Sequence, residues 1–242
     1  MNGMIRLAIL VALASSASAG IAGPEQNVLD RTVSQFSAAG IEVTKAVMKL
    51  ATREGFCVGI ESAVPADNRQ IIGQPKVSLT VSAKTVGEIL DALVAQDPRY
   101  TYRAHGNWVN LLPRSRAEDV GYPLNWTIPG EVVLSSENHG VSLKVNQWLA
   151  EKKVSFVLLH IGTLPAKRLP VSPQTGTLTN PTLREAINVR RTVVGINIWS
   201  ISAPMVSAKG EISFIMSHGV LPSKEAVDRN QAAAAEAKKK SD

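Results

Sequence analysis

The sequence holds a single cysteine, Cys57, and this scarcity excludes an internal disulfide bond. Cys57 lies in the apolar string GFCVGI, where we expect it to be buried as a small hydrophobic residue rather than exposed as a reactive thiol. Beyond the N-terminal region, no apolar run reaches the roughly 20 residues of a transmembrane helix. The sequence therefore predicts no membrane span in the mature chain.

Catalytic and ligand-binding signatures are absent as well. The chain contains no H-E-x-x-H motif, no G-x-S-x-G turn, no G-x-G-x-x-G loop and no P-loop. The four histidines, His105, His139, His160 and His218, lie far apart along the sequence, so we predict no metal site. We also predict no catalytic residue and no cofactor, and an enzyme with an unfamiliar site is the least favoured of three hypotheses.

The N-terminus carries a targeting pattern. A positive charge at Arg6 precedes the apolar residues 7–14, and the small residues Ala17 and Ala19 follow. This order is typical of a secretory signal peptide, residues 1–19, whereas a membrane anchor would need a longer run to cross roughly 30 Å of hydrocarbon. We expect an exported protein, for which nucleic acid is not a partner. Removal of the signal peptide takes away Arg6 and lowers the formal charge of +6 by one. The remaining positive charge suits weak contact with an anionic envelope polymer.

A switch from strand spacing to helix spacing organises the region after residue 76. Three aliphatic residues, Val77, Leu79 and Val81, alternate with polar residues as in a half-buried strand. Thr85 is placed to cap a helix whose apolar face consists of Val86, Ile89, Leu90, Leu93 and Val94. Residues 99–105 and 107–113 then predict a β-hairpin that turns near Gly106.

An earlier helix and strand complete the same unit. One helical face consists of Val43, Ala46, Val47, Leu50 and Ala51. Gly55 is placed to end this helix, residues 56–61 predict a short strand, and residues 32–38 predict another strand before the helix. The fold class is therefore α+β, with the helices packed on a small sheet as a two-layer sandwich over residues 32–113.

The same order of elements recurs about a hundred positions later, which is typical of an internal repeat. The segment PTLREAINVRR aligns with KTVGEILDALV, and a helical face of Val141, Val145, Trp148 and Leu149 precedes the strand SFVLLHI. We predict a tandem duplication, with a second sandwich over residues 122–217 and a charged linker over residues 114–121. Residues 218–242, rich in Ala, Lys and Glu, predict a disordered tail.

The first unit resembles the short N-terminal domain of secretins and TonB-dependent receptors, abbreviated STN. The resemblance rests on the segments VTKAVMKLATREGFCVGIE, TVGEILDALV and RYTYRAHGNWVNLLP, and it covers about Gly40 to Pro113. The second unit, about Tyr122 to Ser217, is similar to the same pattern more weakly. The resemblance implies a bacterial periplasmic domain that is not an enzyme, and that packs against other envelope domains or receives a signalling partner.

Two candidate partner contacts, Trp108 and Arg103, lie on the predicted hairpin of the first unit. Aromatic residues dominate the hot spots of protein interfaces, which favours Trp108. The alternative for Trp108 is simple packing against a helix.

Two further candidates, Arg190 and Arg191, take the last two apolar positions of the first unit's helical face. Unpaired cations on a core-facing stripe would be costly. Either the second helix turns so that Val189 and Val193 face inward and the arginines lie in solvent, or the arginines face an acidic partner or the other unit, since guanidinium groups bind carboxylates well.

The favoured hypothesis is a non-enzymatic, periplasmic interaction module of an envelope secretion or signalling assembly. Edge strands of the two small sheets would accept a strand from a periplasmic or outer-membrane protein. The alternative is a binding protein for an envelope glycan or anionic polymer, using the groove between the units. A single continuous sheet, or a deep acid-lined cleft across both halves, would argue against two sandwiches and for a catalyst.

Overall fold

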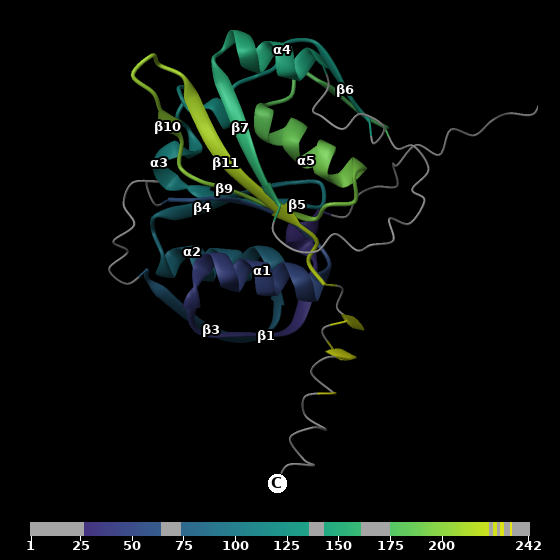
Figure 1. The fold of residues 1–242 in the computed structure, drawn as a ribbon. Coiled ribbons are helices and arrows are strands. Elements are labelled where there is room, and N and C mark those ends of the chain that lie inside the picture. The colour runs from purple at the N-terminus through teal and green to yellow at the C-terminus, as the bar shows by residue number, and fades with distance from the viewer. Residues whose placement is uncertain are drawn as a thin grey trace, which may run out of the picture.

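The structure is a computed structural model that describes residues 27–63, 74–135, 143–160 and 175–222, with a few isolated positions beyond. Within these ranges the chain is mixed α/β, with five α-helices, several sheets and no barrel (Figure 1). The predicted signal peptide, most of the loop after residue 160, Val141 of the predicted helical face and nearly all of the predicted tail lie outside the described residues.

The first half of the chain contains a short 3-10 helix (η1), two α-helices and five strands. In chain order these are η1 (Val28–Asp30), β1 (Thr32–Glu42), α1 (Val43–Glu54), β2 (Cys57–Glu61), β3 (Lys76–Thr85), α2 (Val86–Gln96), β4 (Tyr100–His105) and β5 (Trp108–Pro113). The predicted helical faces are confirmed, because the apolar residues expected to face the core are the buried residues of α1 and α2. The predicted hairpin is confirmed as the antiparallel pair β4–β5.

Local signals set the helix boundaries. Gly55 takes the left-handed conformation, φ 69°, that ends α1. Thr85 and Glu88 form a capping box at the start of α2, in which the Thr85 hydroxyl accepts from the Glu88 N–H and the Glu88 carboxylate accepts from the Thr85 N–H. Thr182 and Glu185 form the same box at the start of α5.

The described part of the second half contains a short 3-10 helix (η2), three α-helices and six strands. These are α3 (Arg114–Ala117), η2 (Pro123–Asn125), β6 (Glu131–Ser135), α4 (Leu143–Glu151), β7 (Val154–His160), β8 (Thr175–Thr179), α5 (Leu183–Val193), β9 (Ile198–Ile201), β10 (Met205–Val206) and β11 (Ile212–Gly219). Strand β6 was not predicted. Two predicted boundaries also differ, since α3 lies inside the expected linker, and the last two residues of β11, His218 and Gly219, lie with the packed residue Leu221 inside the expected tail.

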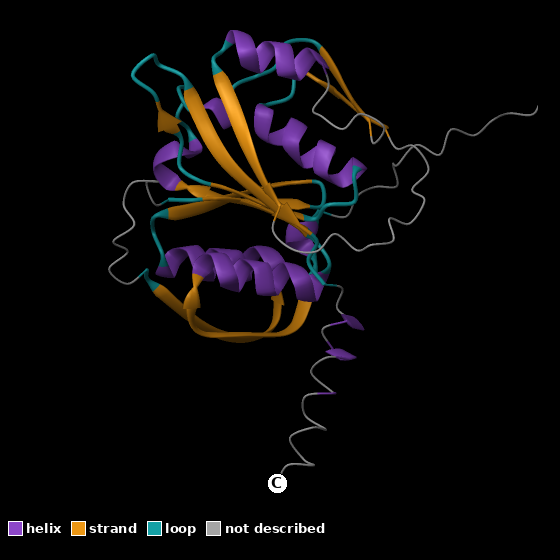
Figure 2. Cartoon of the chain, viewed as in Figure 1, coloured by secondary structure: helices purple, strands orange, loops and turns teal. Residues whose placement is uncertain are grey.

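Strand pairings follow one pattern in both halves. In the first half, β1 pairs antiparallel with β3, β2 pairs parallel with β5, and β4 pairs antiparallel with β5. In the second half, β6 pairs antiparallel with β8, β7 pairs parallel with β11, and β9 pairs antiparallel with β11. Helices α1 and α2 lie between the two sheets of the first half, as Figure 2 shows, so this half has three layers and the expected two-layer arrangement is wrong.

The two halves share one sheet, and on this point the expectation of two separate small sheets is wrong. Strand β2 pairs in parallel with β9, with Val58 beside Ile198 and Ile60 beside Ser200. The result is one sheet of seven strands that includes the larger sheet of each half. The pairing joins two strands that would otherwise be sheet edges and satisfies their backbone hydrogen bonds.

The helices of the two halves lie on opposite faces of this shared sheet. Helices α1 and α2 lie below it in Figure 1, whereas α4 and α5 lie above it. Successive residues of a strand point to opposite faces. Val58 therefore packs in the core of the first half, while Trp199, beside Gly59, packs in the core of the second. Both faces of β5 are covered, because every one of its residues is buried.

Candidate functional site

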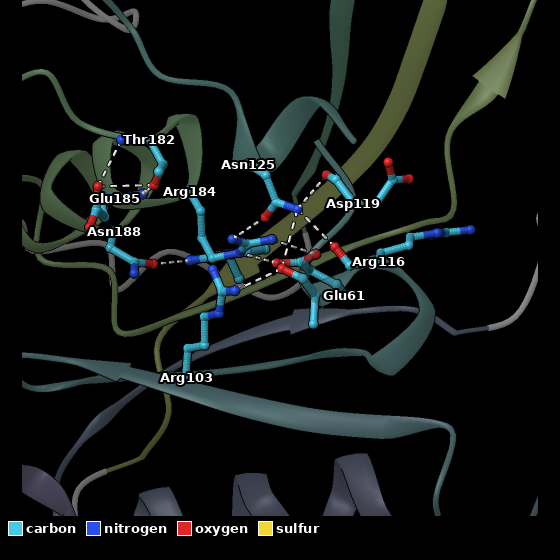
Figure 3. Close-up of polar contacts among 11 residues, drawn as sticks. Glu61, Arg103, Arg116, Asp119, Asn125, Thr182, Arg184, Glu185 and Asn188 are labelled. Atoms are coloured by element: carbon cyan, nitrogen blue, oxygen red, sulfur yellow. Dashed lines mark hydrogen bonds and ion pairs between the residues drawn. The ribbon is translucent and has the colours of Figure 1, made fainter. Parts of the chain in front are cut away.

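A buried ion pair connects the two halves. The carboxylate of Glu61, at the end of β2, accepts hydrogen bonds from Nε and Nη2 of Arg184, in the first turn of α5, at 2.5 and 3.2 Å. Glu61 is fully buried and Arg184 is 4% exposed. Two desolvated charges persist in a protein interior only when they are paired with good geometry. This pair therefore fixes α5 against the strand of the other half (Figure 3).

Asn125 extends the pair into a network, as Figure 3 shows. Its Oδ1 accepts from Nη1 of Arg184 at 2.8 Å, and its Nδ2 donates to the carbonyl oxygens of Arg116 and Asp119, each at 2.8 Å. The guanidinium of Arg116 lies 5.3 Å from the ring centroid of Tyr122, in cation–π contact. Burial, and secondarily the negative charge of Glu61, raises the pKa of the Tyr122 hydroxyl. We call Glu61, Arg116, Tyr122, Asn125 and Arg184 the junction network.

An open cleft of about 690 Å³ lies beside the junction network. We call it the junction cleft, and its main lining residues are Arg103, Glu118, Asn125, Trp126, Trp148 and Lys152. The cleft draws on β4 of the first half, the connection after α3, and α4 of the second half. The indole rings of Trp126 and Trp148 meet edge to face, with centroids 6.3 Å apart.

Arg103, one of the predicted partner contacts, lines this cleft. Its Nη2 donates to the Ala117 carbonyl oxygen at 2.8 Å and to Oε1 of Glu118 at 2.7 Å. The Arg103 side chain is half-exposed and that of Glu118 is almost fully exposed, so the charge of Arg103 is accessible from solvent.

Trp108 is not a surface residue, and the prediction that it contacts a partner is wrong. Its side chain is 4% exposed, and its Nε1 donates to Oγ1 of Thr192 in α5 at 2.8 Å. It points to the face of β5 that the second half covers and packs in the core of that half. The alternative prediction, that Trp108 packs against a helix, is confirmed, and the helix is α5.

Arg190 and Arg191 do not both lie in solvent. Arg190 is only 9% exposed, while Arg191 is partly buried and donates from Nη2 to the sulfur of Met216 in β11. Burial, and secondarily the charge of Arg190, lowers the pKa of Arg191 to about 10. The predicted turn of the helix is nevertheless present, because Val193 is buried and Val189 packs against the core.

The second half leaves one face of its strands incompletely covered. This open face is the side of β7, β9 and β11 that points away from α4 and α5, and it consists of Ser155, Val157, Ile198, Ser200, Ser213, Ile215 and Ser217. All of its residues are serine or aliphatic, and Val157 is 50% exposed. Where the open face meets the start of α1, it borders a concavity of about 660 Å³ that Met48, Ile60 and Tyr100 also line.

Cys57 is half-buried, and its sulfur lies 3.9 Å from Nδ2 of Asn107. Burial raises the pKa of the Cys57 thiol to about 11, against smaller lowering effects from Asn107 and Arg31. Because the thiolate is the nucleophile, we expect the folded protein at pH 8 to react with iodoacetamide at least about 10-fold more slowly than the urea-unfolded chain. Mass spectrometry of timed samples measures both rates.

The pH profile gives a second measure of the same thiol. The rate for the folded protein should still rise above pH 10, whereas the rate for the unfolded chain should level off near the ordinary cysteine pKa. The raised pKa also means that neutral Cys57 contributes stability below the unfolded pKa, and that this contribution is lost as the pH rises toward 11. Equal rates in the two states at pH 8 would contradict the burial.

The junction network was missed by the sequence reasoning, although one signal for it is present. Glu61 occupies the same side of β2 as Gly59, a side that packs against the second half. A carboxylate at the end of an otherwise apolar strand indicates that a cation or hydrogen-bond donor lies beside it. The sequence does not identify this group, because Arg184 lies 123 positions away. Arg184 stands out less, because two other buried residues of α5, Asn188 and Arg190, are also polar.

No protein-family model, curated protein or solved structure matches this chain. Across the described ranges, no three His, Cys, Asp or Glu side chains are grouped so as to hold a metal ion. In the same part of the chain, none of the helices combines the length and apolar character that a membrane span requires.

Proposed function

We propose that this chain is a non-enzymatic periplasmic protein whose two STN-like units, in tandem, form an interaction module of an envelope secretion or signalling assembly. The observation that supports two units is the repeated pairing pattern, in which β1–β3, β2–β5 and β4–β5 have counterparts in β6–β8, β7–β11 and β9–β11. The α+β class of each unit and the tandem duplication belong to this proposal.

The shared sheet counts against two separate sandwiches, so the proposal is of two fused units that share it. The sheet is continuous only because β2 and β9 pair along their edges, and each half keeps its own helices and its own core. The junction cleft is not lined by acids alone, since Arg103 and Lys152 accompany Glu118 and Asp119. This mixture of basic and acidic side chains differs from the acid-lined cleft that would indicate a catalyst.

The open face is the surface that carries the proposed interaction. A solvated sheet face normally carries charged or strongly polar side chains. Among the described side chains the face carries serine, isoleucine and valine, and it leads into a concavity whose lining also includes Glu42 and Lys45 at its edge with α1. The occupant that fits this chemistry is a protein partner that covers the β7–β11–β9 face and inserts an apolar side chain beside Ile198 and Ile215.

Site-specific photo-crosslinking in cells of the source organism tests this proposal. A photoreactive amino acid at Ser217 or Val157, on the open face, should form a discrete adduct with one protein. The same amino acid at Val133, an equally exposed valine on β6, should not. Ile215→Glu should abolish the Ser217 adduct at an unchanged melting temperature, because a buried carboxylate without a partner disfavours docking. Adducts of equal strength at all three positions would contradict the proposal.

A further inference from the structure

The junction cleft has the size and the lining of a small-ligand site, and it is separate from the open face. Ligand sites in proteins enclose roughly 300–1,000 Å³, and the cleft volume of about 690 Å³ falls within that range. None of the residues that line the cleft lines the concavity beside the open face. Whatever occupies the cleft is therefore distinct from a partner docked on the open face.

One wall of the cleft is aromatic and held in place. The indole N–H of Trp126 donates to the Val120 carbonyl oxygen at 2.9 Å, and the ring packs edge to face against Trp148. Trp126 remains partly exposed and also packs against the core of the second half. A fixed, partly exposed indole offers an apolar surface to the C–H face of a pyranose ring, with no side chain to order on binding.

The rim of the cleft supplies positive charge. Arg103 carries an exposed ion pair with Glu118, and exposed pairs contribute about 0–1 kcal/mol, so a ligand carboxylate can replace Glu118 at little cost. The guanidinium fork suits a carboxylate, which it binds through two parallel hydrogen bonds. Lys152 is exposed and makes no ion pair within the part of the chain that the structure describes.

Hydrogen-bonding groups complete the lining. The exposed carboxylates of Glu118 and Asp119 are acceptors suited to sugar hydroxyls. The amide of Asn125 is fully engaged in the junction network, so the floor of the cleft is rigid. Aromatic surface, hydroxyl acceptors and two cations at one site match a sugar that carries an acid group.

We propose that the junction cleft binds an acidic saccharide, with a sugar ring against Trp126 and the ligand carboxylate between Arg103 and Lys152. The site does not depend on the open face or on a protein partner. It would place a saccharide contact at the seam between the two halves, next to the connection that joins them.

Titration calorimetry of the full chain, with defined probes, tests this proposal. The probes are trigalacturonate, its neutral methyl ester, and the disaccharide of N-acetylglucosamine and N-acetylmuramic acid. Trigalacturonate carries its carboxylates on the sugar rings, whereas the disaccharide carries its carboxylate on an ether-linked side chain, so the two acidic probes distinguish these positions. At least one acidic probe should bind, and when trigalacturonate binds, its ester should bind about 10-fold more weakly, because a charge-assisted hydrogen bond is lost.

Variants separate the charge from the stacking surface. Arg103→Gln should weaken the acidic probe about 10-fold and leave the ester unchanged, whereas Trp126→Leu should weaken both. Lys209→Gln, an exposed lysine in the β10–β11 turn, should change neither. The proposal is overturned when neither acidic probe binds at millimolar concentration. Binding of a short poly-aspartate peptide as tightly as the saccharide, with no effect of Trp126→Leu, also overturns it.

Discussion

Arg184→Met is expected to lower the free energy of unfolding by about 3–5 kcal/mol, because it leaves the fully buried carboxylate of Glu61 without a cation. The substitution also removes a donor from Oδ1 of Asn125, which weakens the contact between α5 and the connection after α3. Urea denaturation followed by tryptophan fluorescence measures the loss as a lower midpoint at an unchanged slope.

Two variants separate the buried charge from other effects of losing an arginine. Arg103→Met removes an exposed ion pair and should cost at most about 1 kcal/mol. The double variant Glu61→Leu with Arg184→Met should recover most of the single-variant loss, since replacing a buried pair by apolar residues is often neutral or stabilising. A double variant as unstable as Arg184→Met would show that the loss comes from packing rather than from an orphaned charge.

Gly59→Ala is expected to destabilise the protein by about 3 kcal/mol or more, because the added methyl group has no space. A Cβ at this position would lie 2.3 Å from Oδ1 of Asn110 and 2.4 Å from Cζ2 of Trp199. Both neighbours are buried, on the two strands that flank β2 in the shared sheet, so neither side chain can move aside. For a chain of this size the loss corresponds to a melting temperature lower by about 6–12 °C.

Gly87→Ala is the matched control for this prediction. Its Cβ would lie 3.4 Å from the nearest backbone oxygen, at Leu29, which is ordinary contact. In the first turn of α2 the substitution should leave stability unchanged or raise it by up to about 1 kcal/mol, because alanine favours the helix over glycine. Differential scanning calorimetry of both variants makes the comparison, and equal melting temperatures would refute the close packing at Gly59.

Short-range patterns predicted the elements well. The helical face of α2 was predicted from spacing alone, and the same five residues are buried in the structure. The Thr85 cap and the left-handed end of α1 at Gly55 also followed from local chemistry. These features depend on residues within one or two turns of each other, so the sequence contains all the information they need.

Strand β6 was missed for a local reason as well. Val132 and Leu134 face the core and alternate with the exposed Val133, a pattern typical of a half-buried strand. The strand has only five residues, and the adjacent Gly130 and Glu131 are residues that strands disfavour. These neighbours weaken the strand signal, and no strand was predicted here.

The pairing that joins the two halves was not predictable from short-range patterns. Edge pairing of β2 with β9 uses backbone groups, which every strand carries, so no side-chain pattern distinguishes a strand that will join another sheet. The burial of Trp108 follows from this pairing, because the pairing brings α5 over β5 and places Thr192 against the indole N–H. Sequence spacing identified Trp108 as an aromatic on a hairpin and gave no indication that the second half covers it.

Pairing of β2 with β9 also determines the order in which the molecule can assemble. Val58 lies beside Ile198, 140 positions later, so this contact cannot form until the chain is present through β9. Contacts between such distant residues slow folding because a long loop must close first. The N-terminal half can collapse around α1 and α2 early, but β2 then has no neighbour on one side until β9 emerges. During that interval β2 is exposed to pairing with other chains that are not yet fully folded.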